Sequence, residues 1–401
     1  MMAVFSIQAE EALLQLKGTV VALFPAWIQA WVANLLTIAV VLGGFATLFA
    51  VITLLERKGL GRIQNRLGPN RVGPFGLLQP MADGVKMLIK EDIVPAKADK
   101  VVHFLAPIVL LAPMALAFAV IPYGRGLTPV DLNAGLLFFF AVGAAGEVAA
   151  FMAGWSSRNK YSLLGALRAI SQMISFEIPL VLSTLVVVMM AGSLSLPQIV
   201  DAQQGYWGWV PRWHVFTPWG LAGFFLFLAA ATAESNRAPF DLPEGESELI
   251  GGFMTEYSGF KYAVFFMGEY FGMFAVSGLA ITLFLGGWHA PLPFLEWVPS
   301  FVWFFAKLLG LLFWFIWIRG TLPRLRADQL MNFAWKFLLP LALINVLAAA
   351  LWHFTGGWQY PGAGIGRWIL CGLVIGGPYA GLGYGMMRRK KIGPRIYHFT
   401  N

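Results

Sequence analysis

The sequence predicts an all-α polytopic membrane protein, and three observations lead to that fold class. Apolar residues make up 58% of the 401 residues and charged residues only 12%, a balance far from that of a soluble domain. The charge-poor runs are about 20 residues long, which is the length that a helix needs to cross a bilayer. Lysine and arginine are concentrated in alternate connections between these runs, as they are in membrane proteins of fixed orientation.

About nine runs are expected to cross the membrane within a single membrane domain, residues 1–401. They lie near residues 27–55, 102–121, 134–155, 175–192, 217–233, 262–286, 300–318, 333–353 and 367–387. With the C-terminus inside, the inner segments hold 22 Lys and Arg, whereas the outer segments hold only Lys17, Arg125, Arg212 and Arg367. Because cytoplasmic loops carry the basic excess, the pattern predicts an outer N-terminus and a cytoplasmic C-terminus. It also explains the net charge of +8 without nucleic acid as a partner.

The acidic connection, residues 233–261, is the most unusual stretch of the chain and is expected to face the cytoplasm. It places six carboxylates within 23 residues, namely Glu234, Asp241, Glu244, Glu246, Glu248 and Glu256. Apolar residues such as Phe253 alternate with these acids, which favours packing against neighbouring structure. The alternative is a solvated loop that only joins two spans.

The connection over residues 57–100 is expected to contain a short amphipathic helix. After Pro80, a helical spacing separates an apolar face from a polar face that includes Asp83. About 13 residues reach only ~20 Å, so this helix cannot cross the bilayer. We expect it to lie at the membrane surface, where the simplest alternative role is that of an anchor.

Three acids fall inside predicted spans: Glu147 in the third, Glu177 at the start of the fourth and Glu269 in the sixth. A charged side chain in a span costs roughly 2.5–3.5 kcal/mol on insertion scales, so each should face protein or water. Together with the acidic connection they would form a series of carboxylates that carries protons into the bilayer. For Glu147 the alternative is a neutral buried acid without a transport role.

The residue types expected of a redox or metal centre are scarce. Cys371 is the single cysteine, whereas an iron–sulfur cluster takes about four thiolates. The five histidines lack the spacing of metal ligands. The sequence therefore predicts no metal site and no catalytic residue acting in this chain alone, and any redox centre would lie in another chain.

Several motifs in order carry a family resemblance. They are LERKGLGRIQNRLGPNRVGPFGLLQPMADGVKMLIKED, SSRNKYSLLGALRAISQMISFEIP, AESNRAPFDLPEGESELIGGF and IRGTLPRLRADQLMNFAWK. With them the chain resembles the membrane subunit of respiratory complex I, NADH:quinone oxidoreductase, that is called NuoH in bacteria. The resemblance covers most of the chain.

The resemblance implies a proton-translocating complex in which this subunit forms much of the chamber for a quinone, ubiquinone or menaquinone. The quinone-binding residues would be Glu56, Arg57, Arg66, Asp83, Phe253, Arg319 and Arg324. Proton path and coupling would fall to Glu147, Glu177, Glu269 and the six acids of the acidic connection. The other complex I subunits, peripheral and membrane, would be its partners together with lipid, and FMN and iron–sulfur clusters would reside in those partners. The ninth span and basic tail, residues 367–401, suggest a bacterial chain in the inner membrane.

Two other interpretations are open. An equivalent subunit of a membrane-bound hydrogenase or another quinone-linked dehydrogenase would share these features, and a hydrogenase would need a nickel-binding sister chain. A stand-alone ion transporter would explain the carboxylates in the membrane, but the sequence has no obvious inverted repeat or filter motif.

Overall fold

The computed structural model describes residues 2–242, 250–357 and 363–387, and these residues form a helical protein with one two-stranded hairpin. Eight helical segments are long and apolar enough to cross a membrane. They are α2 (Ala26–Ile63), α4 (Lys100–Ala117), α5 with α6 (Gly135–Gly143, Ala145–Ser156), α7 (Lys160–Ala191), α11 (Gly259–Phe284), α12 (Ser300–Thr321), α13 with η5 and α14 (Ala327–Phe333, Ala334–Leu338, Leu339–Phe354) and α15 (Ala363–Met387). The predicted fold class, an all-α polytopic membrane protein, is confirmed.

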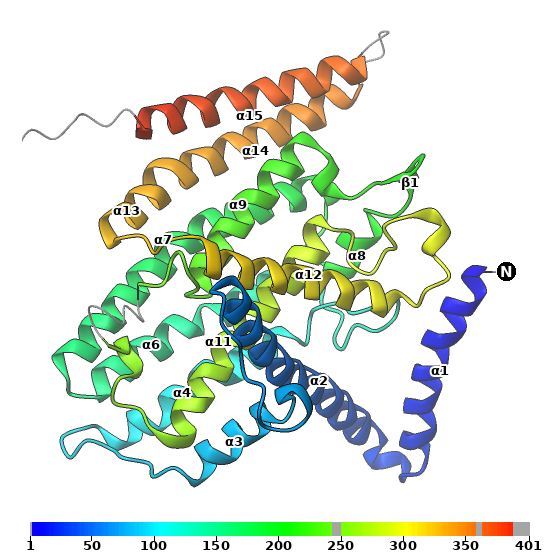
Figure 1. Cartoon of the computed structure of the whole chain (residues 1–401). Coiled ribbons are helices and arrows are strands. Elements are labelled where there is room, and N and C mark those ends of the chain that lie inside the picture. The colour runs from blue at the N-terminus through cyan, green and yellow to red at the C-terminus, as the bar shows by residue number, and fades with distance from the viewer. Residues whose placement is uncertain (1, 243–249, 358–362, 388–401) are drawn as a thin grey trace, which may run out of the picture.

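The fifth expected span is the shorter helix α9 (Pro218–Glu234), which has 17 residues. Its start follows from local chemistry, because Thr217 accepts a hydrogen bond from the Gly220 amide at 3.1 Å and Pro218 suits the first helical position. Near its end, residues 230–233 are all buried. The last turn of the helix therefore lies inside the bundle, whereas Leu221 and Phe225 nearer its start are exposed. Figure 1 shows α9 between α14 and the hairpin.

The remaining elements are short connections or lie outside the spans. They are α1 (Met2–Ala22), η1 (Pro74–Gly76), α3 (Gln79–Ile89), α8 (Leu196–Asp201), β1 (Tyr206–Trp207), β2 (Val210–Pro211), η2 (His214–Phe216), η3 (Gly252–Met254), η4 (Pro293–Leu295) and η6 (Thr355–Gly357). The hairpin pairs Tyr206 with Pro211 and Trp207 with Val210. Only α3 was anticipated among these elements, as the short amphipathic helix.

Helix boundaries extend furthest beyond the expected spans in α2 and α7. Helix α2 continues through Ile63, so the start of the connection at residues 57–63 is helical. Helix α7 begins at Lys160, capped by Asn159, whose side chain accepts from the Tyr161 amide at 3.0 Å. Both extensions contain Leu, Arg and Lys, which have high helix propensity. The charged Arg and Lys interrupt the apolar pattern, so the apolar runs alone did not predict these extensions.

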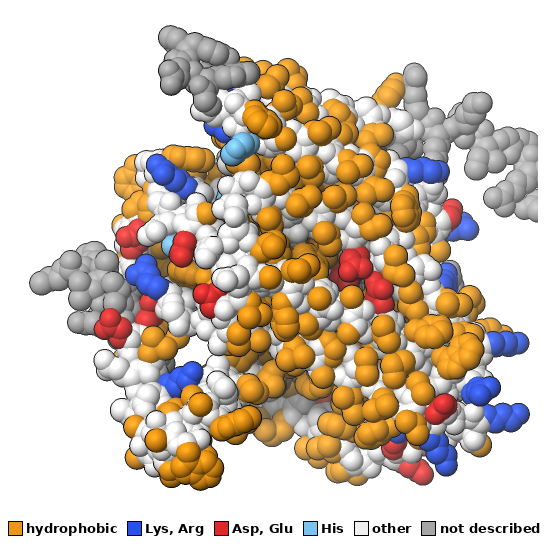
Figure 2. All heavy atoms as spheres, turned by 180° about the vertical axis from the view of Figure 1, so that it is seen from behind, with side chains coloured by type: hydrophobic (Ala, Val, Ile, Leu, Met, Phe, Trp, Pro, Cys, Tyr) orange, Lys and Arg blue, Asp and Glu red, His pale blue; other side chains and the backbone are white. Residues whose placement is uncertain are grey.

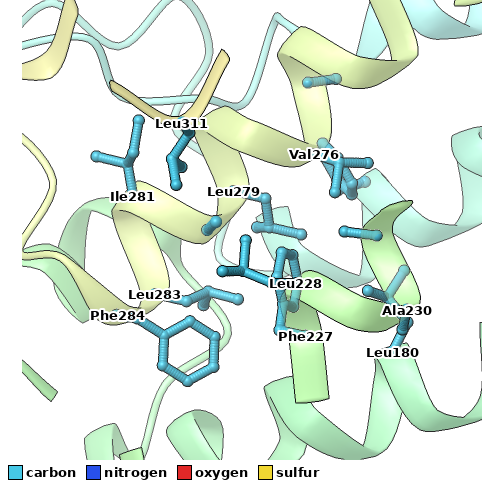
Figure 3. Close-up of a cluster of buried hydrophobic side chains, with 14 of the residues drawn as sticks. Leu180, Phe227, Leu228, Ala230, Val276, Leu279, Ile281, Leu283, Phe284 and Leu311 are labelled. Carbon is cyan, nitrogen blue, oxygen red and sulfur yellow. The ribbon is translucent and has the colours of Figure 1, made fainter. Parts of the chain in front are cut away.

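The hydrophobic core is built around α11. Of the 18 residues that form the most apolar stretch of this helix, 78% are buried. Figure 3 shows Leu180 of α7 near Ala230 of α9, and Leu311 of α12 near Ile281 of α11. Phe227, Leu279 and Phe284 of this core are fully buried. Helices α2, α4 and α14 pack around this centre. A central helix that is apolar on all sides is the arrangement expected of a buried span.

The outer surface has the polarity expected of a membrane protein. Figure 2 shows hydrophobic side chains over most of one face, with Lys and Arg gathered mainly along one edge. Helix α3 leaves its apolar residues exposed, since Met81, Val85 and Leu88 are 70%, 51% and 66% accessible. An exposed apolar face on an 11-residue helix supports the prediction that α3 lies at the membrane surface.

Candidate functional site

A buried ion cluster, here called the Glu56 cluster, joins four separate parts of the chain around Glu56 of α2. The Arg237 guanidinium donates to Glu56 Oε1 at 2.9 Å, and Arg319 of α12 donates to the same oxygen. The Tyr270 hydroxyl of α11 donates to Glu56 Oε2 at 2.5 Å. Both carboxylate oxygens are therefore satisfied, which a buried charge requires.

Arg237 is enclosed by the bundle. Its side chain is only 9% exposed, and its guanidinium lies 4.2 Å from the centre of the Tyr270 ring. Burial by itself lowers the pKa of Arg237, but Tyr270 and Glu56 outweigh that effect and raise it above its ordinary value. Arg237 therefore stays charged at every accessible pH, and Glu56 is its permanent counter-ion.

Two further ion pairs lie close in sequence to the Glu56 cluster but are more exposed. Arg57 pairs with Asp83 of α3 at 2.5 Å, and Arg324 pairs with Asp241 at 2.5 Å. The arginine side chains are 48% and 37% exposed. The polar face of α3 is thus tied to α2, and the acidic connection is tied to the segment after α12.

The first part of the acidic connection is fixed by Gln172 of α7. The Gln172 side-chain nitrogen donates to the carbonyls of Ala233 at 2.7 Å and Phe240 at 2.6 Å, and it lies 3.3 Å from Asn236 Oδ1. Gln172 itself is fully buried. One side chain therefore holds both ends of the turn that carries Arg237.

The second part of the acidic connection packs on α6 and α7. Asn159 donates to Glu256 at 2.6 Å, and the Ser162 hydroxyl donates to the Phe253 carbonyl at 3.2 Å. The backbones approach so closely that a Cβ on Gly165 would lie 2.7 Å from Gly252. Most of the described residues of the connection are therefore packed against the bundle, although Ile250 and Thr255 are exposed. This packing argues against a solvated loop.

A cavity of about 60 Å³ lies between α4, α5, α7, α9 and α11, and it holds three acids. Glu177, Glu234 and Glu269 line it, together with apolar residues and the small residues Gly143 and Gly268. The volume is enough for a few water molecules. Because Glu269 directly precedes Tyr270, the cavity adjoins the Glu56 cluster along one turn of α11.

Glu147 extends this group of acids by one residue. It occupies the first turn of α6, immediately after the interruption of the third span at Ala144. Glu147 lies close enough to Glu177 for the charges of the two groups to interact. Glu234 also lies within range of both. Ionised carboxylates that are brought together repel one another. Glu147 and the three cavity acids thus form one group of neighbouring carboxylates.

The comparisons with known proteins agree with the motifs. The family model described as NADH dehydrogenase matches residues 36–350. The H subunit of the NADH-quinone oxidoreductase of Dehalococcoides mccartyi strain CBDB1 is 54% identical over 321 residues, which are 80% of this chain and 87% of that protein. The chain belongs to the family of NADH-quinone oxidoreductase H subunits.

Other H subunits are nearly as similar. One from Geobacter metallireducens is 50% identical over 323 residues, 78% of this chain and 94% of that protein. The one from Brevibacillus brevis is 47% identical over 339 residues, 84% of this chain and 97% of that protein. Members of this family are parts of an enzyme complex, so the resemblance stated from the motifs is confirmed.

In this family member, most of the predicted site residues that the structure describes fall into two groups. Glu56, Arg57, Asp83, Arg319 and Arg324 are joined by ion pairs at or beside the Glu56 cluster. Glu177, Glu234 and Glu269 line the cavity, and Glu147 lies near Glu177. Asp241 pairs with Arg324, and Glu256 accepts a hydrogen bond from Asn159.

Two predicted residues lie apart from these groups. Arg66 is exposed and donates to Gln64 at 2.7 Å. Phe253 is buried in a separate apolar cluster, with its ring 5.8 Å from that of Phe265. Glu244, Glu246 and Glu248 lie outside the described residues.

Three residues that hold the site together were absent from the predicted set: Arg237, Tyr270 and Gln172. Arg237 carried a signal, because it is the only cation among the six acids. Tyr270 follows Glu269, and its position near a span acid gave a weaker hint. Gln172 sits in a polar part of α7 and has no sequence signal that distinguishes it from a surface residue.

Proposed function

We propose that this subunit forms part of the chamber in which a quinone is reduced and couples that reduction to proton movement in the membrane. The proposal rests on one observation: the ion pairs, the Glu56 cluster and the cavity acids are neighbours in the structure. The pairs Arg57–Asp83 and Arg324–Asp241 lie beside the Glu56 cluster, and Tyr270 of that cluster is the chain neighbour of the cavity acid Glu269.

The proposal that this region binds a quinone rests on the chemistry of the polar head and of the apolar tail of that ligand. A quinone head has two carbonyl oxygens that accept hydrogen bonds, and partly exposed guanidinium groups of Arg57, Arg319 and Arg324 are donors in the right region. Its isoprenoid tail is apolar and would follow the exposed apolar face of α3. The electrons would come from an iron–sulfur centre of a partner subunit.

The proton part rests on the mass balance of the reaction. Reducing a quinone to a quinol takes two electrons and two protons, so proton donors must lie within reach of the chamber. When the quinone takes up protons, the charge near the Glu56 cluster changes, and the cavity acids sense it through Tyr270 and Glu269. A proton held among the neighbouring carboxylates of Glu147, Glu177, Glu234 and Glu269 then moves toward or away from the chamber.

The orientation follows from charge. With 22 Lys and Arg on one side and four on the other, the acidic connection and α3 face the cytoplasm of a bacterial cell and the N-terminus lies outside. The chain works with the peripheral and membrane subunits of NADH-quinone oxidoreductase in the plasma membrane. The names of the relatives, all quinone oxidoreductase subunits, favour this function over a hydrogenase.

The deciding experiment compares two activities in membranes that contain the assembled complex. Asp241→Asn and Glu177→Gln should each lower NADH:quinone reductase activity, whereas electron transfer from NADH to ferricyanide in the peripheral part should remain. Glu11→Gln, an exposed acid of α1, is the matched control. A ratio of the two activities equal to wild type in both variants, at normal assembly, would reject the coupling role.

A further inference from the structure

The N-terminal helix α1 has a position that the quinone function does not explain. It carries Glu10, Glu11 and Lys17, and it is not among the eight segments suited to crossing a membrane. Figure 1 shows α1 at a steep angle to α2, so that the two helices diverge from the turn at residues 23–25. Helix α1 therefore lies at one side of the bundle (Figure 1).

The far part of α1 is held by one buried carboxylate. Glu10 is 5% exposed, and its Oε1 accepts from the Ser300 amide at 2.8 Å, at the start of α12. The amino end of a helix carries partial positive charge, which favours a carboxylate at this position. With its other end joined to α2, helix α1 is fixed at two points over the space between α2 and α12.

That space is a cavity of about 470 Å³. Its walls are apolar and come from α1, α2, α12 and the connection after α4, for example Val20, Val40, Phe45, Leu127, Phe301 and Phe305. Leu16 and Val40 at its margin are 63% and 67% exposed, so the cavity is reached from outside the chain. Its volume lies within the range of ligand pockets, about 300–1,000 Å³.

The mainly apolar walls of this cavity indicate which kind of molecule it can bind. Apolar cavities of this kind do not hold water, because water would lack hydrogen-bond partners there. In a bilayer the abundant apolar molecule is a lipid acyl chain. Lys17 is the one charged residue that lines the cavity, and no carboxylate in the described residues lies within ion-pair distance of it.

We propose that the cavity between α1, α2 and α12 binds one acyl chain of an anionic phospholipid, whose phosphate is paired with Lys17. The lysine ammonium forms a charge-assisted hydrogen bond with a phosphate. An anionic headgroup has a net negative charge that attracts the lysine, whereas a zwitterionic headgroup has no net charge. The site is separate from the Glu56 cluster. It is independent of the quinone proposal, because none of its lining residues belongs to the ion pairs or to the cavity acids.

The test uses the purified complex and two designed variants. Gly44 lines the cavity and Gly43 does not, yet a Cβ at either position meets no atom within 4 Å. Gly44→Phe should fill the cavity without a backbone clash, and Gly43→Phe is the matched control. Lys17→Gln removes the charge, with Arg212→Gln, an exposed cation far along the chain, as its control.

The measurements are the lipids retained after detergent purification, identified by mass spectrometry, and binding of fluorescent phosphatidylglycerol against unlabelled phosphatidylcholine. We expect Gly44→Phe to lose about one phosphatidylglycerol per complex relative to Gly43→Phe. Lys17→Gln should weaken phosphatidylglycerol binding by about fivefold and leave phosphatidylcholine binding unchanged.

Three results would overturn the proposal. Equal lipid retention by Gly44→Phe and Gly43→Phe would show that the cavity holds no acyl chain. Retention of a quinone in place of the lipid, lost on Gly44→Phe, would assign the cavity to a different ligand. If Lys17→Gln left the preference for phosphatidylglycerol over phosphatidylcholine unchanged, the proposed contact between Lys17 and the lipid phosphate would be rejected.

Discussion

Glu56 and Arg237 lie 2.9 Å apart in the centre of the bundle, although 181 residues separate them in the chain. Both side chains are less than a tenth exposed. Helix α2 and the acidic connection are therefore joined by a buried ion pair, and any change in charge near this pair acts on both.

The first prediction concerns removal of the central anion. Glu56→Gln leaves the buried Arg237 without its counter-ion, which should cost about 3–5 kcal/mol of stability. We expect much less assembled complex in membranes and a lower melting temperature of the purified enzyme. The double variant Glu56→Leu with Arg237→Met should recover part of the loss, since it leaves no unpaired buried charge. Additive losses in this double variant would contradict the coupling of the pair.

The second prediction separates stability from quinone chemistry. In the Arg324–Asp241 pair the arginine side chain is 37% exposed, whereas the aspartate side chain is only 9% exposed. Loss of the pair should therefore cost more than the about 0–1 kcal/mol of a surface pair and less than the about 3–5 kcal/mol of a fully buried one. Arg324→Gln should assemble in a reduced but measurable amount and raise the KM for quinone. Arg326→Gln is the control two residues away, where the pair with Asp328 at 3.7 Å is largely exposed. Equal KM values in both variants would place Arg324 outside the quinone chamber.

The cavity acids can be tested without changing any titratable group, and this is the third prediction. Gly143 lines their cavity, and a Cβ there meets no atom within 4 Å. Gly143→Leu should fill a cavity of about 60 Å³ and lower proton pumping, while NADH oxidation by ferricyanide persists. Gly376→Leu, on the exposed side of α15, serves as the control. Normal pumping in an assembled Gly143→Leu complex would exclude a proton path through this cavity.

The fourth prediction concerns the close approach of α7 and the acidic connection. Alanine at Gly165 would place its Cβ 2.7 Å from the Gly252 backbone, so one of the two segments must shift. We expect Gly165→Ala to lower quinone reductase activity and thermal stability together. Gly84→Ala on α3 meets no atom within 4 Å and should stabilise its helix by about 0.5–1 kcal/mol. Equal melting temperatures in the two variants would show that the contact carries no stability.

Much of the fold was predictable because a bilayer imposes simple requirements. Spans must be apolar over a fixed length, and a surface helix must separate its faces, so the nine runs and α3 could be found from the sequence. The continuation of α2 through Ile63 was missed because charged residues suggested a loop. Helix propensity and the burial of Glu56, which depends on tertiary structure, extend the helix there.

The candidate site was predictable in its residue types but not in its connections. An acid inside a span is conspicuous, and Glu147, Glu177 and Glu269 were found for that reason. Their convergence depends on how α6, α7 and α11 are rotated about their own axes, which sequence periodicity gives weakly when a helix is apolar all round. The Glu56 cluster joins residues 181, 214 and 263 positions apart, and only the packed bundle brings them together.

The last prediction concerns the effect of acid on two histidines in the connections before α9 and after α11. His214 of η2 is 8% exposed, with Nδ1 2.8 Å from the Leu283 carbonyl. Burial lowers the pKa of His214 to about 4, although the Leu283 carbonyl opposes the shift. Burial and Lys307 likewise lower the pKa of His289 to about 4. Both histidines are therefore neutral in the folded protein at neutral pH.

The sign of the pH effect follows from these shifts. An unfolded histidine has a pKa of about 6.5, so below that pH the unfolded chain binds protons that the folded chain does not. The stability contributed by the neutral histidines is complete above pH about 6.5 and is lost as the pH falls toward about 4. The melting temperature of the detergent-purified complex should fall across this window. The double variant His214→Gln with His289→Gln should show a shallower fall, and His353→Gln, an exposed residue, should keep the wild-type slope. A wild-type slope in the double variant would mean that these two histidines do not govern the acid sensitivity.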